Sequence, residues 1–125
     1  MPGPVKRSSR LSTALGREIA LLLSRRVKDP RVAFVTVTRV TMPDDLRSAR
    51  VYVRLVQGGD TPERRGEALT GLESAASFLR KEVTRAIGLR HAPELVFAYD
   101  DGQEDVDRIE ALLEEVRAEE RARRS

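Results

Sequence analysis

The longest patterned stretch of the chain begins at Thr61 and has the spacing of an α-helix. Over residues 68–87, apolar residues recur at steps of three and four, which places them on one face of a helix. Thr61 followed by Pro62 is typical of a helix start, and Gly88 is typical of a helix end. The small residues Ser74–Ser77 in the middle predict a kink or break. We therefore expect two helices in this stretch.

Three other stretches have the pattern of β-strands. Residues 33–40 are rich in valine and threonine, and residues 49–56 alternate aliphatic residues with arginine and tyrosine. That alternation fits a sheet with one buried and one exposed face. Pro43, Asp44 and Asp45 form a turn signature between these stretches, which predicts an antiparallel hairpin. After Pro93, alternating Leu, Phe and Tyr at residues 95–99 predict a third strand.

Each end of the chain carries one more predicted helix. Residues 11–27 bear an apolar stripe, with Ser8 or Ser9 as the cap, and the helix should end near Asp29 because Pro30 follows. Residues 103–121 form a last amphipathic helix with a narrow apolar stripe, after which the chain should fray. The members of that stripe are Ile109, Leu112, Leu113 and Val116.

These elements predict a single α+β domain of two layers, with helices packed on one face of a three-stranded sheet. The order is α-β-β-α-α-β, followed by an acidic C-terminal helix. We expect a flexible basic arm at residues 1–8, the folded body at residues 9–101, and the acidic helix with its frayed end at residues 102–125. A chain of 125 residues with 4% aromatic residues can form one core, which must be aliphatic.

Charge is unevenly distributed behind a net value of +3. Residues 1–93 carry 18 Lys and Arg against 9 Asp and Glu, whereas residues 94–125 carry 5 against 11. A basic body with an acidic tail indicates nucleic acid as a partner, and an arginine-rich solvated surface is the alternative. The chain has no cysteine, no apolar run that could cross a bilayer and no signal-peptide pattern. We therefore expect a soluble, cytoplasmic protein.

Two features imitate ligand sites without completing them. Gly66 and Gly71 have the spacing of a phosphate-binding loop, but Leu72 and Glu73 stand where lysine and serine or threonine are required. The pair also lies inside a helical pattern. His91 is the only histidine, and no cysteine is present to share a metal with it. We predict neither a nucleotide site nor a metal site.

Adjacent carboxylates occur at Asp44–Asp45 and at Asp100–Asp101. Such pairs could hold Mg²⁺ or share a proton, but sequence neighbours on an extended segment point in opposite directions. A turn for the first pair and helix capping for the second are the better interpretations. No serine or threonine has a base in the pattern to activate it. We predict that the protein is not an enzyme and needs no cofactor.

Basic residues are the candidate phosphate contacts, because a planar guanidinium can make two parallel hydrogen bonds to a phosphate. Lys81 and Arg85 lie four residues apart on a helix, where like charges repel by about 0.2–0.5 kcal/mol, and an external polyanion would offset that repulsion. Tyr52 could stack on a base, although an ordinary exposed strand aromatic is the simpler interpretation. The candidate RNA-binding residues are Lys6, Arg7, Arg10, Arg47, Arg50, Arg54, Arg80, Lys81, Arg85 and Arg90.

Several separate motifs follow one another with characteristic spacing. They are Asp29-Pro30-Arg31, Val35-Thr36-Val37-Thr38, Asp45-Leu46-Arg47 with residues 49–53, residues 72–80, and Pro93-Glu94-Leu95 with Tyr99-Asp100-Asp101. Together, over about residues 9–113, they resemble the ribosome-binding factor A family.

The resemblance implies a monomeric, type II KH-like domain without enzyme activity. It implies binding to the free 30S small ribosomal subunit, near the neck and the 5′ terminal helix, during late maturation and processing of 16S ribosomal RNA. Ribosomal proteins and other assembly factors would be further partners, and no membrane would be involved. KH domains usually grip nucleic acid with a Gly-x-x-Gly loop between two helices. This family has a kink with an Ala-x-Gly signature there, and the matching positions read Ala75, Ala76 and Ser77, with serine in place of the glycine.

Two functions of other classes remain as alternatives. A protein–protein interaction adaptor without direct RNA contact would use the apolar stripe of the terminal helix. A small hydrolase would need a pocket of convergent polar groups, for which the sequence provides no set.

Overall fold

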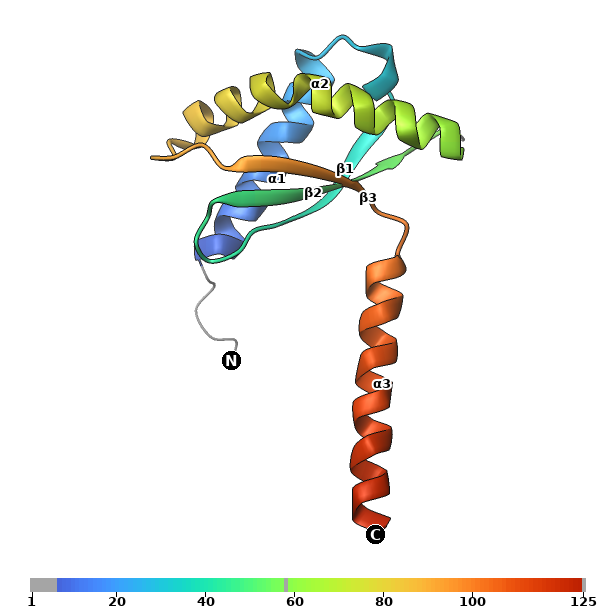
Figure 1. Cartoon of the computed structure of the whole chain (residues 1–125). Helices are drawn as coiled ribbons and strands as arrows, with labels where there is room; N and C mark the ends of the chain where they lie inside the picture. Colours follow the sequence, from blue (N-terminus) through green and yellow to red (C-terminus); the bar gives the residue numbers. More distant parts are fainter. Residues whose placement is uncertain (1–6, 58, 125) are drawn as a thin grey trace.

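The computed structural model describes residues 7–57 and 59–124 (Figure 1). The helices are α1 (Arg7–Arg25), α2 (Pro62–Ile87) and α3 (Gln103–Arg124), with a short 3-10 helix η1 (Pro30–Val32). The strands are β1 (Val35–Thr41), β2 (Ser48–Leu55) and β3 (Glu94–Tyr99). The predicted α+β domain with a three-stranded sheet is confirmed.

The sheet has the strand order β1-β2-β3. β1 and β2 are antiparallel, which confirms the predicted hairpin, and β3 runs parallel to β2 after the crossover through α2. The register of β1 against β2 shifts between Val37 and Arg39, which marks a β-bulge on the edge strand.

The core lies between the sheet and the two helices α1 and α2, which cover the same face. Leu15 and Ile19 of α1, Leu72 and Leu79 of α2, and Val51 of β2 are fully buried in one cluster. The cluster is aliphatic, as expected. Gly71 lets α2 approach η1 closely, because a Cβ at this position would lie 2.9 Å from Val32 Cγ1. Gly71 therefore serves packing, in agreement with the rejection of a phosphate-binding loop.

The prediction of two helices between Thr61 and Gly88 is wrong, because α2 runs without interruption from Pro62 to Ile87. The Ser74 hydroxyl donates to the Thr70 carbonyl at 3.0 Å, so this serine satisfies its side chain within the helix. Its neighbours Ala75 and Ala76 favour helix, and neither proline nor glycine occurs between residues 72 and 87. The kink motif that includes Ser77 is thus part of one continuous helix.

Three helix limits also differ from expectation. α1 begins by Arg7, so Ser8 lies inside the helix and is not its cap, and the predicted arm loses its last two residues. α1 ends at Arg25 instead of near Asp29, and the Val27 N–H turns back to the Leu22 carbonyl at 3.1 Å. Asp29 accepts the Arg31 N–H at 2.9 Å and caps η1 instead. α3 continues to Arg124, beyond the predicted end near residue 121.

α3 extends away from the body of the protein (Figure 1). Its apolar stripe is largely exposed, with Ile109 60% and Leu112 58% accessible. The stripe therefore adds nothing to the core, and α3 leaves the surface of the body accessible.

Candidate nucleic-acid interface

Three segments meet at one end of the body around a depression of about 890 Å³. They are the start of α1, the connection between β1 and β2, and the connection between α2 and β3. Arg7, Arg47, Arg90 and His91 line it, and we call this site the cationic depression. The structure thus brings together three predicted RNA-binding residues that are far apart in the sequence.

The connection between β1 and β2 is held on both sides. The buried Ser8 hydroxyl of α1 donates to Asp44 Oδ1 at 3.0 Å, which ties the start of α1 to this connection. Asp45 Oδ1 accepts the Arg47 N–H at 3.0 Å, and the Arg47 carbonyl accepts the Glu94 N–H at 2.9 Å. The backbone of Arg47 is therefore fixed between a turn and the start of β3.

The connection between α2 and β3 is held by Arg80. Gly88 ends α2 with a left-handed φ of 79°, and its N–H donates to the Thr84 carbonyl. Arg80 then donates from Nε to the Pro93 carbonyl at 3.0 Å and from Nη2 to the Ala92 carbonyl at 2.8 Å. Arg80 is therefore a positioning residue for the loop that carries Arg90. Its predicted phosphate contact stays a prediction.

The charges that line the cationic depression are three guanidinium groups and the Asp45 carboxylate. Some other arginines of the body lie against acidic partners, as Arg31 does with Asp29 at 2.6 Å and Arg65 with Asp60 at 2.5 Å. The hydrogen bonds from these arginines lower the pKa of each aspartate below its usual range. The cationic depression thus keeps an excess of positive charge, and clustered guanidinium groups suit phosphate.

Further predicted cations lie close to this end of the protein. Arg10 is exposed one turn after Arg7 on α1, and Arg85 is exposed in the last turn of α2. Lys81 is exposed one turn before Arg85. Lys6 lies outside the described residues. None of Arg10, Lys81 and Arg85 lines the cationic depression itself, so their phosphate contacts stay predictions.

The remaining predicted cations lie on the open face of the sheet. Arg50 and Arg54 are exposed on β2, and Arg54 Nε donates to the Asp100 carbonyl at 2.8 Å. Arg54 lies seven positions after Arg47 along an extended chain, which is roughly 23 Å at the usual rise of about 3.3 Å per residue. The structure therefore does not join Arg54 to the cationic depression.

Tyr52 is buried, with 4% of its surface accessible, so the interpretation of an exposed strand aromatic is wrong. The guanidinium of Arg39 lies over its ring, 4.1 Å from the centroid. The β-bulge on β1 sets this register, pairing Arg39 with Tyr52. A base could stack on Tyr52 only if Arg39 moved away.

The adjacent carboxylates have separate partners. Asp44 and Asp45 lie in the predicted turn. Asp100 accepts a hydrogen bond from the Thr38 hydroxyl at 2.7 Å, which lowers the pKa of Asp100, and it also accepts the Gly102 N–H at 3.2 Å. Asp100 therefore links β1 to the segment before α3. Among the side chains that the structure describes, which leave out those of residues 103–105 and 107, no three acidic or histidine groups converge as a metal site would require.

Two sets of contacts in this region could not be predicted from the sequence. The Ser8–Asp44 bond joins residues 36 positions apart, and the Arg80 bonds reach main-chain carbonyls, which leave no mark in a pattern of residue types. The Asp29-Pro30 pair did carry a usable signal, because a capping aspartate followed by proline at the first helical position is typical of a helix start.

The comparisons with known proteins agree with the fold. Within the part of the chain that the structure describes, no helix combines the length and the apolar composition needed to cross a membrane. The sequence profile of ribosome-binding factor A matches residues 7–113. Ribosome-binding factor A of Geobacter metallireducens is 44% identical over 115 residues, which covers 92% of this chain and 95% of that protein.

Solved structures give the same result. The solution NMR structure of a putative ribosome-binding factor A from Thermotoga maritima is similar, with a TM-score of 0.68 and 32% identity over 82% of this chain and 94% of that one. A homology model of the Thermus thermophilus factor, fitted into the cryo-EM map of its 30S complex, is similar with a TM-score of 0.58 and 26% identity. That likeness covers 73% of this chain and 92% of the Thermus chain. The chain therefore belongs to the ribosome-binding factor A family.

Proposed function

We propose that this protein is a ribosome assembly factor that binds the free 30S small ribosomal subunit through phosphate groups of 16S ribosomal RNA. The cationic depression carries the proposal, because it gathers Arg7, Arg47 and Arg90 from three segments at one end of the body. Family membership supports the partner, since the Thermus thermophilus factor was fitted into the map of a 30S complex.

The binding mode follows from the way the site is built. The backbone around Arg47 and Arg90 is held by hydrogen bonds before any RNA arrives, so little ordering of the chain is needed on binding. Arginine contacts to phosphate supply affinity without reading sequence, whereas the fold of the RNA decides where several phosphates match the cations. The rigid cationic depression would thus select a particular shape of the RNA backbone.

The finer part of the proposal concerns the stage and the place of action. The factor would act in the cytoplasm, in late maturation and processing of 16S ribosomal RNA, near the neck and the 5′ terminal helix of the subunit. It would hold an immature RNA conformation without catalysing a reaction, and it would leave when the mature conformation or another assembly factor competes for the same surface.

A second function uses a different surface. A protein–protein adaptor would dock through the exposed apolar stripe of α3, and the accessibility of Ile109 and Leu112 favours this alternative. Its binding would survive ribonuclease treatment and depend little on salt, because burial of apolar surface does not release counterions.

Co-sedimentation distinguishes the two functions. We expect the purified protein to sediment with free 30S subunits and not with complete ribosomes, and to be released by ribonuclease treatment of the subunits. Deletion of residues 103–125 should leave this binding in place. Binding that resists ribonuclease and disappears with the deletion would establish the adaptor instead.

A further inference from the structure

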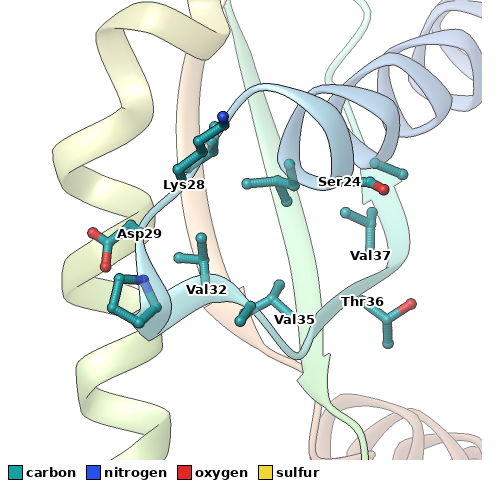
Figure 2. Close-up of a pocket in the computed structure, with 12 residues that line it drawn as sticks. Ser24, Lys28, Asp29, Val32, Val35, Thr36 and Val37 are labelled. Carbon is teal, nitrogen blue, oxygen red and sulfur yellow. The ribbon is translucent and has the colours of Figure 1, made fainter.

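A groove runs between α1 and the outer edge of β1, away from the cationic depression. It consists of two hollows of about 570 Å³ and 430 Å³, both of which are lined by Ala20 of α1 and Val37 of β1. Figure 2 shows the larger hollow, with Ser24 of α1 and Val37 of β1 toward one end and Lys28, Asp29 and Val32 toward the other. The lining combines aliphatic residues with hydroxyl and charged ones, so the groove offers apolar contacts together with polar contacts to an extended chain.

The main chain of β1 is available along this groove. β1 is an edge strand, since the sheet order is β1-β2-β3. Its partner residues show which way its main-chain groups point. Leu55, opposite Val35, donates its N–H to Tyr99 Oη on the far side, and Val53, opposite Val37, accepts the Asp100 N–H there. Leu55 and Val53 therefore do not hydrogen-bond to the β1 residues opposite them. In such a pair of an antiparallel ladder, both residues turn their N–H and C=O groups away from each other, so Val35 and Val37 present these groups to the free edge.

The β-bulge limits how far a new strand could pair. The register of β1 changes after Val37, so the regular edge ends there. Bulges on edge strands interrupt further pairing. The free edge at Val35 and Val37 therefore suits a short extended segment and not a long strand.

The charged residues of the groove are mainly basic. Arg17, Lys28 and Arg39 line it together with Asp29, whose carboxylate is held by Arg31 at 2.6 Å. An occupant with acidic residues would match these cations. A second copy of this chain would instead bring the same cations against each other, which opposes edge-to-edge pairing of two copies.

We propose that the groove between α1 and β1 binds an extended acidic peptide segment of a partner protein, which adds a short fourth strand to the sheet beside Val35 and Val37. Alternate apolar side chains of the segment enter the groove, its main chain pairs with β1, and flanking carboxylates meet Arg17 and Lys28. RNA fits this site less well, because the described side chains that line the groove include no aromatic ring on which a base could stack.

The test uses the full-length protein and a synthetic octapeptide in which two glutamates flank each end of Val-Thr-Val-Thr. We expect binding that shifts the NMR signals of the Val35 and Val37 amides. The same peptide with lysines in place of the glutamates should bind at least tenfold more weakly. Two further peptides carry N-methyl groups on both valines or on both threonines. One of them should lose binding and the other keep it. The main-chain N–H groups of successive residues of a strand point to opposite edges, so those of both valines face one edge and those of both threonines face the other.

Variants of the protein locate the site. Ala20→Glu places a carboxylate on an exposed residue within the groove and should weaken peptide binding at least tenfold. Ala86→Glu makes the same change on an exposed residue of α2 and should leave binding unchanged. Ala20→Glu should bind free 30S subunits like the parent protein, so the result is independent of the proposed RNA-binding function.

Three results would overturn the proposal. They are equal binding of both N-methylated peptides, equal weakening by Ala20→Glu and Ala86→Glu, and displacement of the peptide by a single-stranded oligouridine that shifts the same two amides. The last result would assign the groove to RNA.

Discussion

Arg80 offers the sharpest test of how the cationic depression is built. Its guanidinium donates to the carbonyls of Ala92 and Pro93, and lysine cannot reproduce this two-pronged geometry. Each such bond contributes about 0.5–1.5 kcal/mol at a partly exposed position. Arg80→Lys keeps the charge and loses at least one bond, so it should loosen this loop by about 1 kcal/mol.

Amide hydrogen exchange measures the loosening directly. The Glu94 N–H directly follows Pro93 and is bonded to the Arg47 carbonyl, so it reports on the loop that Arg80 holds. Its exchange should accelerate about fivefold for a loss of about 1 kcal/mol, since a factor of ten corresponds to about 1.4 kcal/mol. The Asp100 N–H beyond the other end of β3, bonded to the Val53 carbonyl, should be unchanged. Arg85→Lys, an equivalent change on the exposed surface of α2, is the matched control. If Glu94 exchanges at the parent rate in Arg80→Lys, Arg80 does not position the loop.

Three further predictions concern the body and α3. Gly66→Ala should stabilise the protein by up to about 1 kcal/mol in urea unfolding, because a Cβ at residue 66 meets nothing within 4 Å. Gly71→Ala should be about 1–3 kcal/mol less stable than Gly66→Ala, because a Cβ at residue 71 would lie 2.9 Å from Val32 Cγ1. Equal stability of the two variants would contradict the close contact between α2 and η1. Thr38→Val removes the hydrogen bond that lowers the pKa of Asp100, so NMR titration should show that pKa rising, and the variant should be about 0.5–1 kcal/mol less stable at pH 7. A lowered carboxyl pKa stabilises the fold at neutral pH and loses that effect as the pH falls below the ordinary value of 3.8. The difference in unfolding free energy between the parent and Thr38→Val should therefore shrink at low pH. A difference that is independent of pH would refute the link between Thr38 and the pKa of Asp100. Deletion of residues 103–125 should change the unfolding free energy by less than about 0.5 kcal/mol, because the stripe of α3 is exposed, and a larger loss would show that α3 supports the body.

Periodicity was sufficient to predict most of the fold. The strand at residues 49–56 and the helical stripe of residues 68–87 are strong signals because one face of each is buried, and burial is what periodicity reports. The break predicted at Ser74–Ser77 from residue preference does not occur, because local hydrogen bonding outweighs that preference. A serine that bonds back to a carbonyl within its own helix, as Ser74 does, is accommodated without a break.

The sequence predicted which residues are cationic but could not predict which of them meet. Arg7, Arg47 and Arg90 come together because Ser8, Gly88 and the parallel pairing of β3 with β2 bring three segments to one end, and such long-range geometry has no local signal. The same limit applies to Tyr52. Alternation placed it on the open face, but only the β-bulge on β1 brings Arg39 over its ring.

The salt dependence of 30S binding tests the central claim most directly. Binding of the protein to purified free subunits should be measured between 50 and 200 mM salt for the parent, for Arg47→Gln/Arg90→Gln, and for Arg25→Gln/Arg64→Gln, which removes two exposed arginines outside the cationic depression. Each lost phosphate contact reduces the slope of log K against log salt by about 0.7–0.9. The account predicts a slope about 1.4–1.8 shallower for Arg47→Gln/Arg90→Gln and little change for the control. Equal slopes for all three proteins would contradict it.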